Sequence, residues 1–139
     1  MAFVHGKGTA VSLDSNDLSP FSNSVTFGRT ADTHDVTTFG KNSKVYAAGL
    51  KDGTATIEGI YDNTESTGPG AVLRPLIGAA AVPLVYEPEG TGAGRPVSTV
   101  DVLVTSYEET APVADMVTFT AELQLSDDIV DTTGAAGAV

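Results

Sequence analysis

The stretch VTSYEETAPVADMVTFTAELQLS, residues 104–126, contains the clearest structural pattern in this chain. In its second half, apolar residues from position 117 to position 125 alternate with Thr118, Thr120, Glu122 and Gln124. A period of two with one apolar side is typical of a β-strand that packs one face on a core. The polar side suits an ordinary solvated sheet, and it also suits a sheet that lines a wet channel. The pattern therefore favours a protein that works through its surfaces rather than through a pocket.

Similar patterns along the rest of the chain predict a mainly β fold. We expect a β-sandwich or partly closed barrel of seven or eight strands, with one short flanking helix at residues 71–80 that Pro75 shortens or kinks. Residues 31–34 have the composition of a polar break, residues 51–53 that of a tight hairpin turn, and Gly59 indicates a bulge or a close backbone approach. The predicted strands cover residues 9–13, 24–29, 35–39, 46–50, 54–62, 82–87, 98–108 and 116–125.

Length and composition limit the classes of protein to which the chain can belong. With 139 residues it is long enough for one domain, which we place at residues 1–130, followed by a flexible tail of small residues at 131–139. The absence of cysteine excludes disulfides and thiolate metal sites. We expect no membrane association and no export signal, and therefore assembly in the cytoplasm. The net charge of −11 disfavours binding to phosphates or anionic lipids.

The sequence predicts no catalytic residues, no cofactor and no metal site. Residues 90–95 are rich in glycine, but they lack the Lys-Ser/Thr of a P-loop and are expected to form a hairpin loop. Asp32, His34 and Asp35 lie on a turn and a strand start, where their side chains would not converge on one ion. Asp14, Asn16 and Asp17 resemble a fragment of a calcium loop, but the central glycine and the distal glutamate of such a loop are missing. Asp127, Asp128 and Asp131 form a second acidic group.

The long predicted strands leave sheet edges that a monomer would have to protect. Little proline or lysine guards the strands at residues 98–108 and 116–125. Association of several copies edge to edge into a ring would remove these edges.

Four segments, in order, resemble the small tail tube proteins of long-tailed phages. They are DLSPFSNSVTFGRTADTHDVTTFG (17–40), YAAGLKDGTATIEGIYD (46–62), VYEPEGTGAGRPV (85–97) and VTSYEETAPVADMVTFTAELQLS (104–126), about two-thirds of the chain. The resemblance implies a structural virion protein, with no enzymatic activity, whose subunits form hexameric rings that stack into a tube. DNA would pass through the tube without specific binding, and inner strands of neighbouring subunits would join into one large barrel.

The resemblance also implies partners and contact residues. The partners would be further copies of the chain and other tail proteins, such as the tape measure protein and the tail terminator, in the tail of the virion. Thr118, Thr120, Glu122 and Gln124 are candidates for a channel-facing or solvated sheet face. Candidate contacts between subunits or stacked rings come from the N-terminal residues and the segment 39–50, namely Phe3, Val4, Phe39, Lys41, Lys44, Tyr46 and Leu50.

Two alternatives remain open at the level of sequence. The first is a capsid decoration protein of a phage, which would also be a small β-rich virion protein. The second, from another class, is a ligand- or calcium-binding β-sandwich module.

Overall fold

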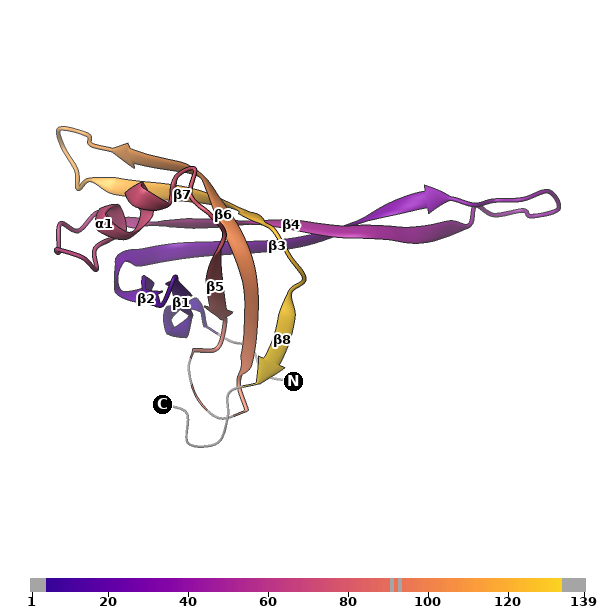
Figure 1. The fold of residues 1–139 in the computed structure, drawn as a ribbon, viewed down its shortest axis with the longest axis horizontal. Helices are drawn as coiled ribbons and strands as arrows, with labels where there is room; N and C mark the ends of the chain where they lie inside the picture. The colour runs from indigo at the N-terminus through magenta and orange to yellow at the C-terminus, as the bar shows by residue number, and fades with distance from the viewer. Residues whose placement is uncertain (1–4, 91, 93, 134–139) are drawn as a thin grey trace.

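A computed structural model describes residues 5–90, 92 and 94–133 of the chain (Figure 1). One short α-helix, three 3-10 turns and eight strands follow one another along it. In chain order the elements are η1 (Gly6–Gly8), β1 (Ala10–Leu13), β2 (Asn16–Asp17), η2 (Ser19–Phe21), β3 (Ser22–Asp35), β4 (Tyr46–Ile60), α1 (Pro69–Leu73), η3 (Arg74–Leu76), β5 (Val82–Glu87), β6 (Pro96–Thr110), β7 (Thr118–Leu125) and β8 (Val130–Thr133).

All eight strands belong to one antiparallel sheet that does not close. Its order is β2-β1-β5-β6-β7-β4-β3, and β8 pairs with the first residues of β6. The prediction of a mainly β fold with seven or eight strands and one short helix is confirmed. The helix begins at Pro69 and gives way at Arg74 to a 3-10 turn that contains Pro75, so it is shorter than the predicted 71–80.

The sheet folds over itself, and the long strand β6 belongs to both of the resulting halves. Residues 98–102 pair with β5, whereas residues 102–110 pair with β7. A register shift between Val104 and Ser106 interrupts the second ladder, and such a bulge bends a strand. Figure 1 shows the resulting curvature of β6. The rings of Phe27 on β3 and Tyr86 on β5 stack 5.2 Å apart, which shows that the two halves of the sheet meet.

The core fills the space between these halves and follows the predicted alternation. β7 and the part of β4 from Gly53 onward turn every second residue inward, and Val100, Val102 and Val104 do so on β6. Gly59 lies opposite a register shift in β3, and a Cβ at this position would stand 2.0 Å from the carbonyl oxygen of Phe21. The predicted close backbone approach at Gly59 is therefore confirmed. The buried apolar residues are Val11, Leu13, Leu18, Ala55, Ile57, Val72, Leu73, Leu84, Val100, Val102, Val104, Phe119, Ala121, Leu123 and Leu125.

Three local predictions on β3 and β4 are wrong. Residues 31–34 are part of β3, not a polar break, and residues 36–39 lie in a loop rather than in a strand. Residues 51–53 lie within β4 and form no turn. Gly53 is needed there for a close approach, because a Cβ would stand 2.4 Å from the carbonyl oxygen of Gly28.

The predicted tail begins with residues that the structure places in a strand. Asp131, Thr132 and Thr133 belong to β8 and pair with Ser98, Val97 and Pro96. Residues 134–139 lie outside the described part of the chain.

Candidate assembly surfaces

The hairpin of β3 and β4 projects from the rest of the molecule as an arm (Figure 1). We call residues 31–51 the arm and the remainder of the described chain the body. The ladder continues to the pair Asp35 and Tyr46, and the loop 36–45 closes it. Within this loop the N–H of Val36 donates to the carbonyl of Val45 (2.8 Å), and the N–H of Val45 donates to the Thr37 hydroxyl (2.8 Å). Backbone hydrogen bonds and turn contacts hold the arm together, since none of its side chains is buried.

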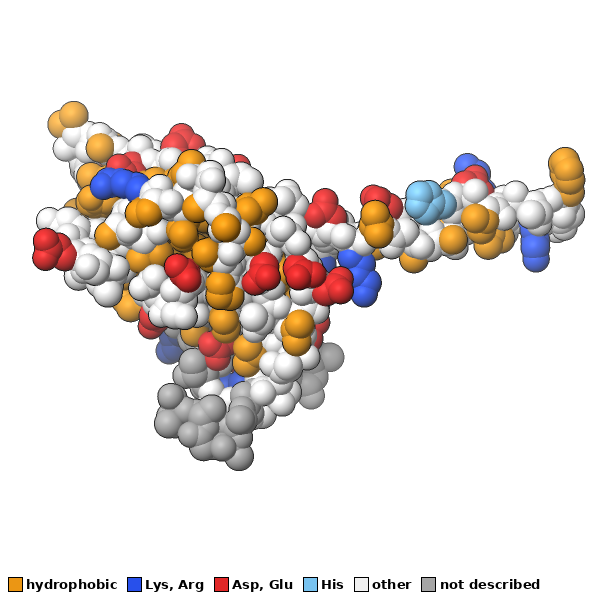
Figure 2. Space-filling model, viewed as in Figure 1, with side chains coloured by type: hydrophobic (Ala, Val, Ile, Leu, Met, Phe, Trp, Pro, Cys, Tyr) orange, Lys and Arg blue, Asp and Glu red, His pale blue; other side chains and the backbone are white. Residues whose placement is uncertain are grey.

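The arm concentrates exposed apolar and basic side chains. Of the eleven large hydrophobic side chains that are exposed in the described residues, five lie on the arm. They are Val36, Phe39, Val45, Tyr46 and Leu50. Residues 36–51 also contain three of the seven Lys and Arg residues and no Asp or Glu. Figure 2 shows hydrophobic and basic side chains along this projection.

The structure brings most of the predicted contact residues together on this arm. Phe39, Lys41 and Lys44 lie in the loop, Tyr46 is the first residue of β4, and Leu50 lies nearer the body. All five side chains are exposed. Phe3 and Val4 lie outside the described residues.

The outer face of β3, β4, β7 and the second half of β6 is polar and acidic. The pairing places Thr118, Thr120, Glu122 and Gln124 on this face of β7, opposite the buried Phe119, Ala121 and Leu123. The register defines three rows across the four strands. They are Ser24, Glu58, Thr120 and Glu108; Thr26, Thr56, Glu122 and Ser106; and Gly28, Thr54, Gln124 and Leu103. The rows contain three glutamates and no lysine or arginine.

The four-stranded part of the sheet, in the order β6-β7-β4-β3, has an open edge on each of its two sides. β3 is the last strand of the sheet, so its side away from β4 has no strand partner among the described residues. On β6, the strand β5 reaches only residue 102, and Ile77 forms an isolated bridge to Val104. Residues 106–110 pair with β7 on one side, and no described strand covers their other side. The sequence showed that edges exist, but the strands that carry them follow only from the topology.

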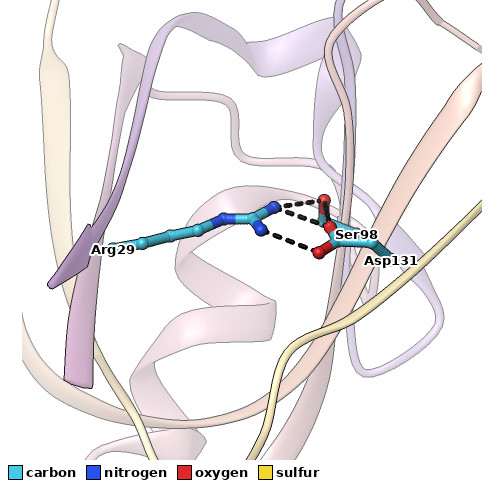
Figure 3. Close-up of polar contacts among 3 residues, drawn as sticks. All are labelled: Arg29, Ser98 and Asp131. Carbon is cyan, nitrogen blue, oxygen red and sulfur yellow. Dashed lines mark hydrogen bonds and ion pairs between the residues drawn. The ribbon is translucent and has the colours of Figure 1, made fainter. Parts of the chain in front are cut away.

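A polar cluster fixes β8 beside the root of the arm (Figure 3). The Arg29 guanidinium on β3 donates two hydrogen bonds of 2.7 Å to the Asp131 carboxylate and one of 2.9 Å to the Ser98 hydroxyl. Ser98 in turn donates to Asp131 (2.7 Å). The hydrogen bonds from Arg29, with a smaller contribution from Ser98, lower the pKa of Asp131 to about 2. No local sequence pattern predicts this cluster, because its three residues are far apart along the chain.

A second cluster fixes the helical segment to the end of β6. Arg74 donates to the Glu109 carboxylate (2.6 Å), and so does the Tyr107 hydroxyl (2.6 Å). The hydrogen bond from Tyr107 is the main cause that lowers the pKa of Glu109, and Arg74 adds to it. Burial raises the pKa of Tyr107, and its bond to Glu109 raises it further. The arrangement is that of a structural clamp, because the carboxylate is engaged by both neighbours.

The described residues contain no group of three or more His, Asp or Glu side chains that are placed to hold a metal ion. A hollow of about 930 Å³ lies at the arm root between Arg29, Lys51 and the acidic segment 126–131. None of the described helices combines the length and the apolar character that a membrane crossing requires.

The fold is shared with solved tube-forming assemblies. A chain of the tail of an empty gene transfer agent particle, solved with C6 symmetry, matches with a TM-score of 0.77 at 11% identity, over 94% of this chain and 100% of that one. A chain of the SPP1 tail tube matches with a TM-score of 0.72 at 10% identity, over 96% and 81%. A chain of the PVC sheath–tube complex, from an extracellular contractile injection system, matches with a TM-score of 0.71 at 16% identity, over 94% and 92%. At the level of sequence, no family model and no curated protein matches.

Proposed function

We propose that this chain is a tail tube subunit, a structural virion protein that forms stacked hexameric rings around a DNA channel. One observation carries the proposal: four strands form a sheet with two open edges and an acidic outer face that contains no cation in its three central rows. The shared fold with tail and tube assemblies, one of them with sixfold symmetry, supports it. The proposed role requires no catalytic residue, cofactor, metal or membrane.

Ring closure would use the two open edges. The β3 edge of one copy would pair with residues 106–110 on β6 of the next copy, so that backbone N–H and C=O groups find partners. Such a contact is heterologous, because it joins two different edges of the subunit. It produces a closed ring when the rotation between neighbouring copies is a whole-number fraction of a full turn. Six copies would contribute four strands each to one continuous barrel. With a strand spacing of about 4.8 Å and a tilt of about 40°, this barrel would be roughly 50 Å across at its backbone.

The acidic face would line the bore. Glu58, Glu108 and Glu122 would then repeat around every ring, with Thr118, Thr120 and Gln124 between them. DNA–protein affinity comes mainly from cations that neutralise phosphates. A wall without cations would therefore let DNA pass without holding it.

Stacking of the rings would use the arm. Its exposed residues Phe39, Lys41, Lys44, Tyr46 and Leu50 would contact the neighbouring ring, and Phe3 and Val4 remain predicted contacts. A stable interface buries more than roughly 1,000 Å², so ring and stacking contacts together must exceed this area. The tape measure protein and the tail terminator are the further proposed partners. Assembly in the host cytoplasm would place the protein in the virion tail.

The ring contact can be tested by disulfide cross-linking, because the chain has no cysteine of its own. A double variant would carry Thr26→Cys on β3 and either Ser106→Cys or Glu108→Cys on β6. Two strands separate these positions within one copy, which is about 14 Å and too far for a disulfide. Cross-links would therefore form between copies, and non-reducing gels should show a ladder that ends at six.

The two single-cysteine variants are the matched controls, since neither can form more than a dimer. Negative-stain microscopy of the unmodified protein should show rings or tubes. A protein that stays monomeric at every concentration would refute the proposed function. Tubes that form without any β3–β6 cross-link would refute the edge assignment alone.

A further inference from the structure

The end of the body opposite the arm carries a second exposed loop. The connection between β6 and β7, residues 111–117, lies at that end (Figure 1). Val113 is fully exposed at its turn, and Met116 is also exposed. The segment 108–116, EETAPVADM, contains three acidic residues and no lysine or arginine. We call residues 108–117, which include the last residues of β6, the acidic loop.

The arm and the acidic loop are complementary. The arm presents Phe39 with lysines and, beyond Asp35, no acidic residue. The acidic loop presents Val113 and Met116 beside Asp115, and Glu108 lies at its start. The carboxylate of Glu109 is already engaged by Arg74 and Tyr107. Opposite charges around apolar side chains are typical of two surfaces that dock on each other. The two surfaces point in opposite directions from the body, so one molecule cannot bring them together (Figure 1).

We infer that the acidic loop is the docking site for the arm of a second copy of this chain in the adjacent ring. The inference rests on the proposed tube and names the surface that receives the arm. Rings that stack in one orientation bring opposite ends of the subunit together, and such head-to-tail contacts propagate without closing. Contacts between like ends would place lysines against lysines, or carboxylates against carboxylates.

The hollow at the arm root is the other acidic surface that could receive an arm. Asp127 and Asp128 line it, but so do Arg29 and Lys51, and Asp131 is already engaged by Arg29. An incoming lysine would meet these cations. The acidic loop offers two exposed apolar side chains, Val113 and Met116, beside Asp115. The hollow offers no large apolar side chain that is comparably exposed, which favours the acidic loop.

Charge exchange between copies tests this contact. Variant A carries Lys41→Glu and Lys44→Glu on the arm, and variant B carries Ala114→Lys and Asp115→Lys on the acidic loop. All four positions are exposed, so both variants should fold. In each variant alone the stacking contact joins like charges, and the fraction of protein in tubes should fall about tenfold or more, since weak surface contacts repeat around each ring. Mixing A with B restores opposite charges at every contact and should restore tubes of alternating rings.

Variant C, with Asp127→Lys and Asp128→Lys in the hollow at the arm root, is the matched control. It should form tubes alone and should not rescue variant A. Unchanged melting curves for A, B and C would show that folding is intact. Rescue of A by C instead of B, or no rescue by B, would overturn the docking assignment while the proposed tube stands. If the unmodified protein forms no tubes under any condition, the proposed function fails, and the inference fails with it.

Discussion

The body and the arm of this protein are held together in different ways. The body buries fifteen apolar residues between two halves of one folded sheet. The arm buries none, and depends on a two-stranded ladder and a few turn hydrogen bonds. A two-stranded hairpin in water is at best marginally stable on its own.

The difference separates residues that fold the chain from residues that remain free for contacts. A chain gains little stability from exposed Phe39, Tyr46 and Leu50, because their apolar surface stays in water. Exposed apolar groups gathered on one projection are typical of an interaction surface. Stability and assembly should therefore respond to different substitutions.

The largest contrast is expected between two phenylalanines. Phe119→Ala removes a buried ring near the start of β7, and it should lower the free energy of unfolding by about 3–5 kcal/mol. Phe39→Ala at the arm tip should change it by less than about 0.5 kcal/mol, but should reduce tube formation. Urea denaturation of the unassembled protein measures the first quantity, and electron microscopy measures the second. A large loss of stability in Phe39→Ala would show that the arm packs on its own body.

Two glycines sharpen the contrast at the level of the backbone. An alanine Cβ at Gly59 would lie 2.0 Å from the Phe21 carbonyl oxygen, so the backbone would have to move. Gly59→Ala should cost about 1–3 kcal/mol, the range for overpacking a tight site. At Gly49 on the arm, the nearest atom is His34 Nε2 at 2.7 Å, at the end of a side chain that can rotate away. Gly49→Ala should therefore cost much less, and equal losses of thermal stability in the two variants would contradict this account.

The sequence predicted the strands of the body well, because each of these strands has one face toward the core and one face toward solvent. The residues of β7 alternate between core and solvent, and so do those of β6 up to Val104, which is why the strand pattern was visible. The arm has solvent on both sides, so its strands show no alternation, and residues 31–34 and 51–53 looked like a break and a turn. Local turn chemistry at Lys51 and Asp52 was overridden by the pairing of β4 with β3, in which Lys51 lies opposite Ala31 and Asp52 opposite Thr30.

The candidate surfaces were predictable only in part. The resemblance to tail tube proteins indicated Phe39, Lys41 and Lys44 as contacts, through their place in the segment 39–50. The open edges of β3 and β6 depend on which strands are neighbours, and no local pattern encodes that order. The cluster of Arg29, Ser98 and Asp131 joins residues 102 and 33 positions apart, so its members have no common sequence signal.

The smallest expected effect lies where the arm root meets the body, at the pair of Arg29 and Asp131. Both side chains are about half exposed, at 48% and 55%, so the pair contributes modestly and is screened by salt. The folded pKa of Asp131, about 2, lies below the ordinary value of 3.8. The ionised carboxylate therefore favours the folded state. Its contribution should be complete above about pH 5 and should disappear as the pH falls toward 2.

Melting curves of the protein and of Asp131→Asn, recorded from neutral to acid pH, measure this contribution. The variant should melt lower at pH 7, and the gap should close as the carboxylate becomes protonated. Arg29→Gln should lower the melting temperature in a similar way, and the double variant should show less than the sum of both losses, because each single change already removes the pair. A gap that keeps its size at acid pH would mean that Asp131 acts through packing, and that the arm root is not held to β8 by charge.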